Sequence, residues 1–343
     1  MLRMTLDGTA RVRWEETAEP TLAGQDGAIV RPLAVATCDL DVAVLAGRYP
    51  LAGPYPFGHE AVAEVVEIGD NVVSVAPGDR VVVPFQISCG TCAPCTRSRT
   101  GNCAAHPRMS AYGLGTLGGL QWGGLLADLV FVPHADAMLV GLPAGLDPVD
   151  VASASDNIPD AWRTVGPQLA AEPGADVLVV GGDSGPNSIG LYAVGLAVAL
   201  GASQVSYLDH DPGRLTVADA LGAAVIDSTP PRKAGTFPIT VDASGTPDGL
   251  RCALNSTAPD GTCTSPSVYL EDPVLPMLAM YSRCCTLHTG RVHARPAIPA
   301  VLDLIARGFD PSAVTSAVVT RAEAADALAR PPMKLVITCG DPG

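Results

Sequence analysis

The sequence predicts an α/β protein that joins a β-rich N-terminal part to a doubly wound parallel sheet. Its 343 residues exceed what one hydrophobic core usually supports, so two domains are expected. Residues 25–85 consist of short β-branched segments separated by turn residues. Residues 176–227 instead alternate apolar strand-like runs with helical segments, a pattern typical of a parallel sheet covered by helices.

The β-rich part is predicted from three segments, at residues 28–35, 61–69 and 80–85. Gly69-Asp70-Asn71 and Pro77-Gly78-Asp79 supply turns between them, so the strands are expected to be antiparallel. Residues 127–133 and 137–143 return to strand character.

The pattern changes near residue 148. Asp147 is predicted to cap a helix with Pro148 at its first position, running to about Val165 with an interruption at Pro159. The parallel sheet should follow, with strands at 176–182, 205–209 and 224–227 and helices at 188–201 and 212–221. A helix at 298–308 and a strand at 334–339 are predicted to close the chain.

Composition narrows the class of protein. Apolar residues make up 48% and charged residues 16%, as in an ordinary globular chain. A net charge of −14 argues against nucleic acid or an anionic membrane as partner. The N-terminus lacks a signal-peptide pattern, and the longest apolar run, Ile189–Ala202, is too short to span a bilayer, so we expect a cytoplasmic protein.

Four cysteines lie within residues 86–124, a segment rich in Cys and Gly: Cys89, Cys92, Cys95 and Cys103. Four thiolates this close can complete a tetrahedral shell around Zn²⁺, leaving no open position, which predicts a structural site. An iron–sulfur cluster is the alternative for closely spaced cysteines. The cysteines at 252, 263, 284, 285 and 339 are predicted to be core residues.

Cys38 and the tripeptide Gly58-His59-Glu60 provide a second, weaker signal. A lone Cys or His is more often structural than a ligand. Together with a carboxylate, the two could form an open three-ligand zinc site with room for a substrate oxygen.

Cys38-x2-Asp41, Gly58-His59-Glu60, the four-cysteine lobe and the following βαβ unit occur in an order that resembles the zinc-dependent medium-chain dehydrogenase/reductase (alcohol dehydrogenase) family. The resemblance covers nearly the whole chain. It implies a GroES-like catalytic domain at residues 1–152 with a structural-zinc lobe at 86–108. A Rossmann NAD-binding domain would follow at 153–285, and residues 286–343 would return to complete the catalytic domain.

The same resemblance implies a site and a chemistry. Cys38, His59 and Asp156 would bind a catalytic zinc, with Glu60 behind them or as a transient fourth ligand and Asp41 supporting the ligands. Together with the structural ion this makes two zincs per subunit. Zinc would polarise the oxygen of a primary or secondary alcohol, or of the matching aldehyde or ketone, while hydride passes between carbon and nicotinamide.

Two positions depart from the family pattern. Family members often carry Ser or Thr two residues after the zinc cysteine, where this chain has Leu40, and some carry His where it has Ala43. Leu40 cannot transfer a proton. The proton would leave to water, through Asp39 or through Tyr49.

The cofactor is predicted from the glycine-rich segment after the first parallel strand. Its backbone would approach the pyrophosphate, although Asn187 replaces a central glycine and the loop is about four residues longer than usual. Asp209 would bind the ribose hydroxyls and favour NAD over NADP, unless Arg214 turns toward the ribose. The expected cofactor-binding residues are Gly181, Gly182, Gly185, Ser188, Ile189, Gly190, Asp209 and Arg214.

Two other functions stay open at this point. One is a zinc-free NAD(P)H-dependent enoyl or quinone reductase of the same fold, against which Cys38, His59 and the cysteine lobe argue. The other is a non-catalytic nucleotide- or zinc-binding regulator, to which Leu40, Ala43 and Asn187 give weight. The family resemblance also implies a homodimer or homotetramer.

Overall fold

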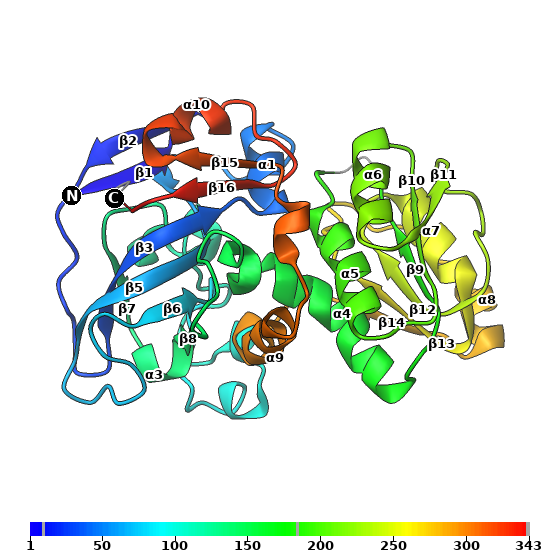
Figure 1. Cartoon of the computed structure of the whole chain (residues 1–343), viewed down its shortest axis with the longest axis horizontal. Helices are drawn as coiled ribbons and strands as arrows, with labels where there is room; N and C mark the ends of the chain where they lie inside the picture. The colour runs from blue at the N-terminus through cyan, green and yellow to red at the C-terminus, as the bar shows by residue number, and fades with distance from the viewer. Residues whose placement is uncertain (9–10, 183–184, 341–343) are drawn as a thin grey trace. The chain divides into compact units, whose positions relative to one another are not determined.

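A computed structural model describes residues 1–8, 11–182 and 185–340 (Figure 1). The chain forms two compact units. Unit 1 contains residues 1–159, 293–306 and the chain from Thr315 onward, and unit 2 contains residues 160–292 and 307–314. Asp183 and Ser184, in the glycine-rich loop discussed above, lie outside the described residues.

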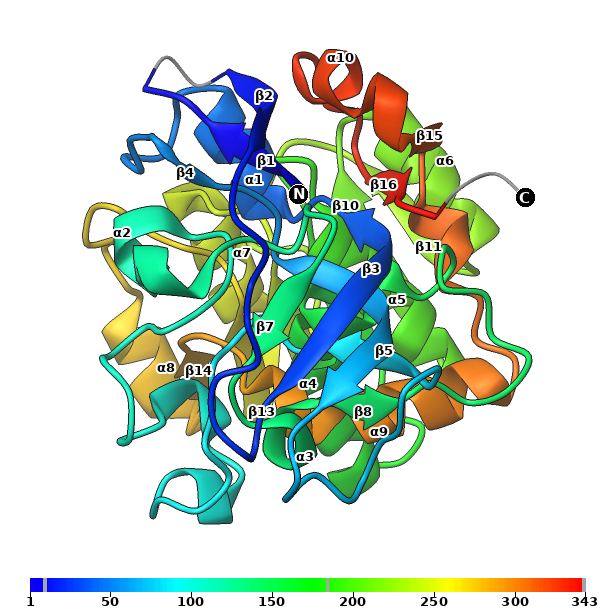
Figure 2. The same ribbon diagram turned by 90° about the vertical axis from the view of Figure 1, so that its left-hand side faces the viewer.

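Unit 1 is built on a seven-stranded sheet in the order β15-β16-β3-β5-β6-β8, with β7 also paired to β3. Figure 2 shows β3 and β5 side by side in this sheet. The strands are β3 (Ala28–Ala36), β5 (Glu60–Ile68), β6 (Arg80–Val83), β7 (Val130–Val132), β8 (Val140–Gly141), β15 (Ala317–Thr320) and β16 (Leu335–Thr338). The three N-terminal segments predicted as antiparallel strands thus form β3, β5 and β6.

The register of β3 and β5 positions the site. Ala36 lies opposite Glu60 in the antiparallel pair. Cys38 follows the end of β3 and His59 precedes the start of β5, so this register brings both residues to the same end of the sheet.

A second, three-stranded sheet in unit 1 was not predicted. It has the order β2-β1-β4, formed by β1 (Leu2–Leu6), β2 (Val12–Glu16) and β4 (Tyr55–Pro56). The shorter helices of this unit are α1 (Asp39–Leu45), α2 (Gly115–Gly118), α3 (Ala135–Met138) and α10 (Ala324–Leu328).

Unit 2 contains a six-stranded, wholly parallel sheet in the order β11-β10-β9-β12-β13-β14. The strands are β9 (Val177–Val180), β10 (Val205–Asp209), β11 (Ala224–Asp227), β12 (Phe237–Asp242), β13 (Thr257–Ser265) and β14 (Thr286–Thr289). The helices are α5 (Ser188–Ala199), α6 (Pro212–Ala220), α7 (Pro247–Ser256) and α8 (Met277–Arg283). The chain order reverses between β9 and β12, which makes this the switch point where doubly wound sheets bind ligands.

The prediction that a helix begins after Asp147 was wrong. Asp147 accepts a hydrogen bond from the Val149 amide in a turn, and α4 begins only at Asn157, running to Ala171 after a short 3₁₀ segment at Ala152–Ser155. Pro159 lies in the first turn of α4, where backbone amides have no partner within the helix, so it interrupts nothing.

The predicted helix at 298–308 begins earlier, because α9 spans Ala294–Ala306. Among the described residues, no helix combines the length and apolar character needed to cross a membrane.

Candidate metal centres and cofactor site

Cys38 is held in place by the start of α1. It is the N-cap residue of this helix, and its Sγ accepts a hydrogen bond from the Leu40 amide at 3.4 Å. Its own amide donates to Asp41 Oδ2 at 3.0 Å. The short sequence Cys-Asp-Leu-Asp therefore closes a capping box that fixes the thiol at a helix N-terminus.

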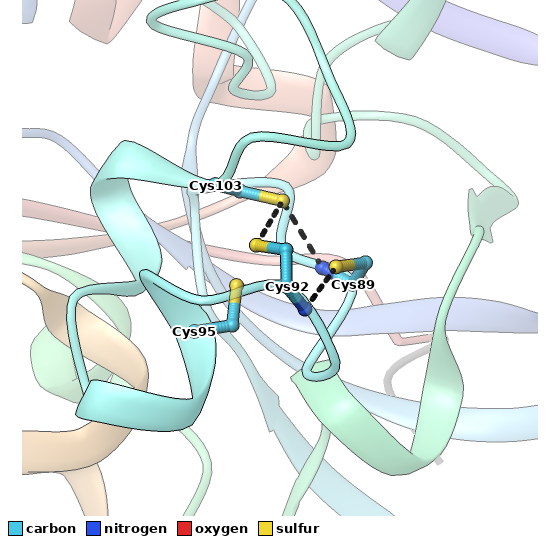
Figure 3. A group of neighbouring side chains, drawn as sticks. All are labelled: Cys89, Cys92, Cys95 and Cys103. Carbon is cyan, nitrogen blue, oxygen red and sulfur yellow. Dashed lines mark hydrogen bonds between the residues drawn. The ribbon is translucent and has the colours of Figure 1, made fainter.

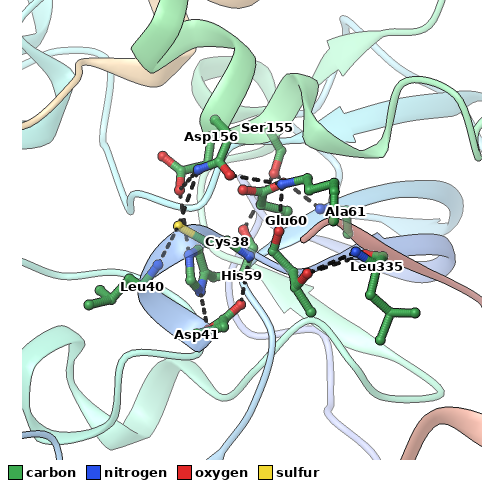
Figure 4. A network of polar contacts seen from close by, with 12 residues as sticks. Cys38, Leu40, Asp41, His59, Glu60, Ala61, Ser155, Asp156 and Leu335 are labelled. Carbon is green, nitrogen blue, oxygen red and sulfur yellow. Dashed lines mark hydrogen bonds and ion pairs between the residues drawn. The ribbon is translucent and has the colours of Figure 1, made fainter. Parts of the chain in front are cut away.

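His59 is oriented by the same carboxylate. Its Nδ1 lies 3.3 Å from Asp41 Oδ1, while its Nε2 lies 3.4 Å from Asp156 Oδ2 (Figure 4). A carboxylate behind one ring nitrogen fixes the tautomer and leaves the other nitrogen for a metal, as is common for zinc-binding histidines.

Asp156 reaches this point from the residue before α4. Cys38, His59, Glu60 and Asp156 each offer a ligand atom, and these atoms lie within 4.8 Å of one another. All four residues are buried. The structure thus brings together the three predicted zinc ligands, with Glu60 beside them and Asp41 behind His59.

Sequence reasoning missed Lys334 and Asn157. The fully buried Lys334 donates to Glu60 Oε2 at 2.9 Å, to Asn157 Oδ1 at 2.8 Å and to the Thr37 carbonyl at 2.5 Å. The one available signal was a lysine opening the apolar segment 334–339, since a buried lysine needs an anionic or polar partner.

The charges of this cluster suit a divalent cation. Burial, reinforced by the charge of Asp156, raises the pKa of the Cys38 thiol. Burial lowers the pKa of His59, but the charge of Asp41 and hydrogen bonds to Asp156, Asp41 and Cys38 together raise it well above its usual value. Burial also raises the pKa of Glu60 to about 7, against the opposing effect of Lys334. The cluster therefore holds four acidic groups, namely Cys38, Asp41, Glu60 and Asp156, against two basic groups, His59 and Lys334.

The donor set fits zinc. One thiol, one imidazole and one carboxylate are the ligand types of open, three-ligand zinc sites, which keep a position free for another oxygen. A proton on His59 would have to leave when such an ion binds. Leu40 offers only an apolar side chain here, and Tyr49 packs against the hydrophobic core of unit 1.

The second cluster unites the four cysteines of the 86–108 lobe (Figure 3). The Sγ atoms of Cys92 and Cys103 lie 3.8 Å apart, and all four thiols are free. Backbone amides point at the sulfurs, from Cys89 to Cys103 Sγ at 3.4 Å and from Ala104 to Cys92 Sγ at 3.3 Å. Hydrogen bonds from the backbone amides of Ala104 and Cys95 lower the pKa of Cys92 to about 6. At neutral pH this sulfur is therefore a thiolate, the form that binds a metal.

The glycine-rich loop of unit 2 needs small residues at particular positions. A Cβ on Gly181 would lie 2.2 Å from Asp209 Oδ2, and one on Gly190 would lie 2.9 Å from the Cβ of Ala243. A Cβ on Gly182 would likewise lie 2.9 Å from the Cβ of Ser244, whereas a Cβ on Gly185 would meet nothing within 4 Å.

Asn187 replaces a glycine by adopting a left-handed conformation with φ of 63°. Its Nδ2 donates to the Gly182 carbonyl at 2.5 Å, which closes the loop onto α5. The predicted residues Ser188 and Ile189 form the first turn of that helix.

The buried Asp209 and the half-buried Arg214 form one hydrogen-bonded unit. Both Asp209 carboxylate oxygens accept from Arg214 at 2.7 Å, and the Tyr207 hydroxyl donates to Oδ2 at 2.8 Å. Burial raises the pKa of Asp209, but hydrogen bonds led by Arg214 outweigh it and lower the pKa overall. Arg214 is therefore turned toward Asp209. Beside them, a pocket of about 310 Å³ is lined by Gly182, His210, Thr229, Pro230, Thr246, Pro247 and Asp248.

Comparisons with known proteins agree with this architecture. Residues 24–144 match the model of the alcohol dehydrogenase GroES-like domain. The chain is 31% identical to a probable zinc-binding alcohol dehydrogenase of Mycobacterium tuberculosis, over 90% of this chain and 79% of the relative. It is 36% identical to the glutathione-independent formaldehyde dehydrogenase of Pseudomonas aeruginosa, over 59% of this chain and 50% of that protein.

Among solved structures, alcohol dehydrogenase TADH from Thermus sp. ATN1 superposes with a TM-score of 0.87 at 27% identity, covering 98% of this chain and 99% of that one. Sequence relatives, fold and ligand clusters lead to the same assignment. The chain belongs to the zinc-dependent medium-chain alcohol dehydrogenase family.

Proposed function

We propose that this oxidoreductase is NAD-linked and interconverts a primary or secondary alcohol with its aldehyde or ketone, using a catalytic zinc held by Cys38, His59 and Asp156. The observation that carries the proposal is the buried convergence of these ligand atoms within 4.8 Å. A zinc-free reductase of the same fold would have no use for this set. Relatives named as formaldehyde and L-threonine dehydrogenases support alcohols and aldehydes as the substrate class.

When bound, the zinc supplies Lewis acidity toward a substrate oxygen. The chain's own residues prepare the site for that role. Asp41 holds both the Cys38 backbone and the His59 ring, so two ligands share one support. Glu60 Oε2 accepts a hydrogen bond from Lys334, and three protein ligands, Cys38, His59 and Asp156, would leave one position of a tetrahedral zinc for substrate.

A second zinc is proposed at Cys89, Cys92, Cys95 and Cys103. Four sulfur ligands leave no position for substrate, so its role is to stabilise a lobe with little apolar core of its own.

NAD is proposed over NADP because Asp209 lies buried at the end of β10. A carboxylate at this position opposes a 2′-phosphate, and Arg214 is engaged with that carboxylate by two hydrogen bonds. The pyrophosphate would bind at the N-terminus of α5, near Gly182 and Gly185.

Self-association is proposed through unit 2. Six of its large apolar side chains are 58–88% exposed along one segment, namely Val268, Leu270, Val274, Met277, Leu278 and Tyr281. This segment precedes β14, the terminal strand of the six-stranded sheet, which a second copy could extend. Replacing Leu278 by Glu should lower the mass measured by light scattering, whereas an unchanged mass would remove this surface from the assembly.

The test of the function is Cys38→Ser. The variant should lose turnover and one of about two zinc equivalents, yet bind NADH as the unmodified protein does, because the cofactor residues lie in unit 2. Cys284 was predicted to be a core residue, but it is exposed and lies outside both clusters, so Cys284→Ser is the matched control. Retained turnover in Cys38→Ser would remove this thiol from the chemistry.

A further inference from the structure

The Asn157 side chain contacts two of the proposed zinc ligands, Cys38 and Asp156, which lie far apart in the sequence. It is the first residue of α4 and is fully buried. Its Nδ2 lies 3.1 Å from Cys38 Sγ and 3.3 Å from Asp156 Oδ2, so one amide group donates toward both ligand atoms.

Lys334 fixes which way the amide points. A lysine ammonium can only donate hydrogen bonds, so the amide atom 2.8 Å from Lys334 Nζ must be the oxygen of Asn157. The NH₂ group therefore faces the thiol. Lys334 is itself held by Glu60 Oε2 and the Thr37 carbonyl, which leaves the amide little freedom to flip.

We propose that Asn157 is a positioning residue that holds Cys38 and Asp156 in one ligand set and weakens electron donation from the Cys38 sulfur to the metal. This inference rests on the catalytic zinc proposed above. It assigns a role in that site to a residue pair, Asn157 and Lys334, that binds neither metal nor substrate.

The physical reason lies in the chemistry of the donor. A thiolate and a carboxylate side by side repel each other, and a shared N–H donor offsets part of that repulsion. A hydrogen bond to a ligating sulfur also withdraws electron density from it, so the metal keeps more of its positive charge. The Leu40 amide donates to the same sulfur at 3.4 Å. With the Asn157 amide present, the Cys38 sulfur accepts from two donors.

When Co²⁺ replaces zinc, the bond between the metal and the Cys38 sulfur can be followed by absorption spectroscopy. A Co²⁺ ion bound to a thiolate gives a charge-transfer absorption whose energy falls as the sulfur becomes more electron-rich. The part of this absorption lost in Cys38→Ser reports the proposed catalytic site, separately from the four-cysteine lobe.

The test variant is Asn157→Leu, which keeps the side chain's approximate size but removes the amide. Its Cys38-dependent band should move to longer wavelength, and Co²⁺ affinity measured by chelator competition should fall about 10- to 100-fold, as for other residues that support metal ligands. Asn157→Asp keeps an acceptor for Lys334 and replaces the donor by an oxygen. It should also lose affinity while keeping more of the thermal stability, which covers the case in which the leucine variant fails to fold.

Thr164→Val is the matched control. Thr164 is a buried polar residue of α4 whose hydroxyl donates to the Ala161 carbonyl, away from the ligands. Its band position and affinity should match those of the unmodified protein.

Two results would overturn the inference, and they are distinguishable. A Cys38-dependent band that keeps its position and affinity in folded Asn157 variants would reject the role of Asn157 alone. Absence of any such band in the unmodified protein would reject the catalytic metal itself, and the inference with it.

Discussion

The Lys334 ammonium lies 2.9 Å from the Glu60 carboxylate, and both side chains are completely buried. Neither charge can be hydrated, so each depends on the other and on the hydrogen bonds around them. This ion pair lies next to the proposed metal ligands. It connects β16, which Lys334 directly precedes, to β5, which begins at Glu60.

Replacing Lys334 by Met should therefore destabilise the protein strongly. The variant removes the buried cation that is hydrogen-bonded to Glu60, a change that typically costs about 3–5 kcal/mol. Urea unfolding should show this loss. Combining Lys334→Met with Glu60→Gln should recover part of it, because the second change removes the uncompensated carboxylate. If Lys334→Met lowers the free energy of unfolding by less than about 1 kcal/mol, Lys334 and Glu60 do not depend on each other in the way proposed.

The same variant should respond to pH with a defined sign. Burial already raises the pKa of Glu60 to about 7, and Lys334 opposes this rise. Without Lys334 the pKa of Glu60 in the folded state would rise further, so the folded variant would hold this proton still more tightly relative to the unfolded chain. Deprotonation then favours unfolding, so the stability deficit of Lys334→Met should grow from pH 6 to pH 8. A deficit that shrinks over this range would argue against an ionised Glu60 in the unmodified protein.

Gly181→Ala should impair cofactor binding. Its new Cβ would lie 2.2 Å from Asp209 Oδ2 and force this carboxylate from its place at the end of β10. We expect NADH affinity in a fluorescence titration to fall tenfold or more, about 1.4 kcal/mol. Gly141→Ala, in β8 of unit 1, is the control, because its Cβ would meet nothing within 4 Å and it is not among the proposed cofactor-binding residues. Equal affinities in the two variants would show that Asp209 does not need its position for NADH.

Loss of the structural metal should act locally. Cys103→Ser removes one of four ligands and leaves the Cys89 amide without its sulfur acceptor. The variant should lose one zinc equivalent and be cleaved faster by proteases within residues 86–108, with little change in NADH binding. Metal analysis and mapping of the first cut test this, with Cys284→Ser as control. Unchanged zinc content would reject the four-sulfur site.

Much of the fold was predictable because its signals are local. Strands β3, β5 to β11 and β16 were predicted from apolar runs and turns, and the four-cysteine cluster from its spacing alone, whereas β13, β14, β15 and the three-stranded sheet were not predicted. The start of α4 was misplaced because Asp147-Pro148 satisfies a helix-start pattern, yet Asp147 caps only a turn. Local chemistry was compatible with either position, and tertiary structure decided between them.

The support of the candidate site was not predictable in this way. Lys334 and Glu60 are 274 positions apart, and Asn157 and Cys38 are 119 positions apart. Neither pair leaves a periodic or spaced pattern in one sequence. The ligands themselves were proposed by family resemblance, which describes residues that touch the metal better than residues that hold those ligands in place.

A histidine pair formed by His106 of the cysteine lobe and His134 should make the stability of the protein depend on pH. His106 and His134 face each other with their Nε2 atoms 2.8 Å apart, and Trp122 packs edge-on against His106. Burial lowers the pKa of both rings, and the charge of His106 lowers that of His134 further, while Asp26 opposes this effect. The unfolded chain therefore binds protons at a higher pH than the folded protein, so stability present above about pH 6.5 is lost as the pH falls. His106→Gln should narrow the difference in Tm between pH 7.5 and pH 5.5, whereas His288→Gln, at an exposed histidine outside the pair, should leave it unchanged. If both variants keep the full difference, the acid sensitivity arises elsewhere, and the paired rings contribute nothing to it.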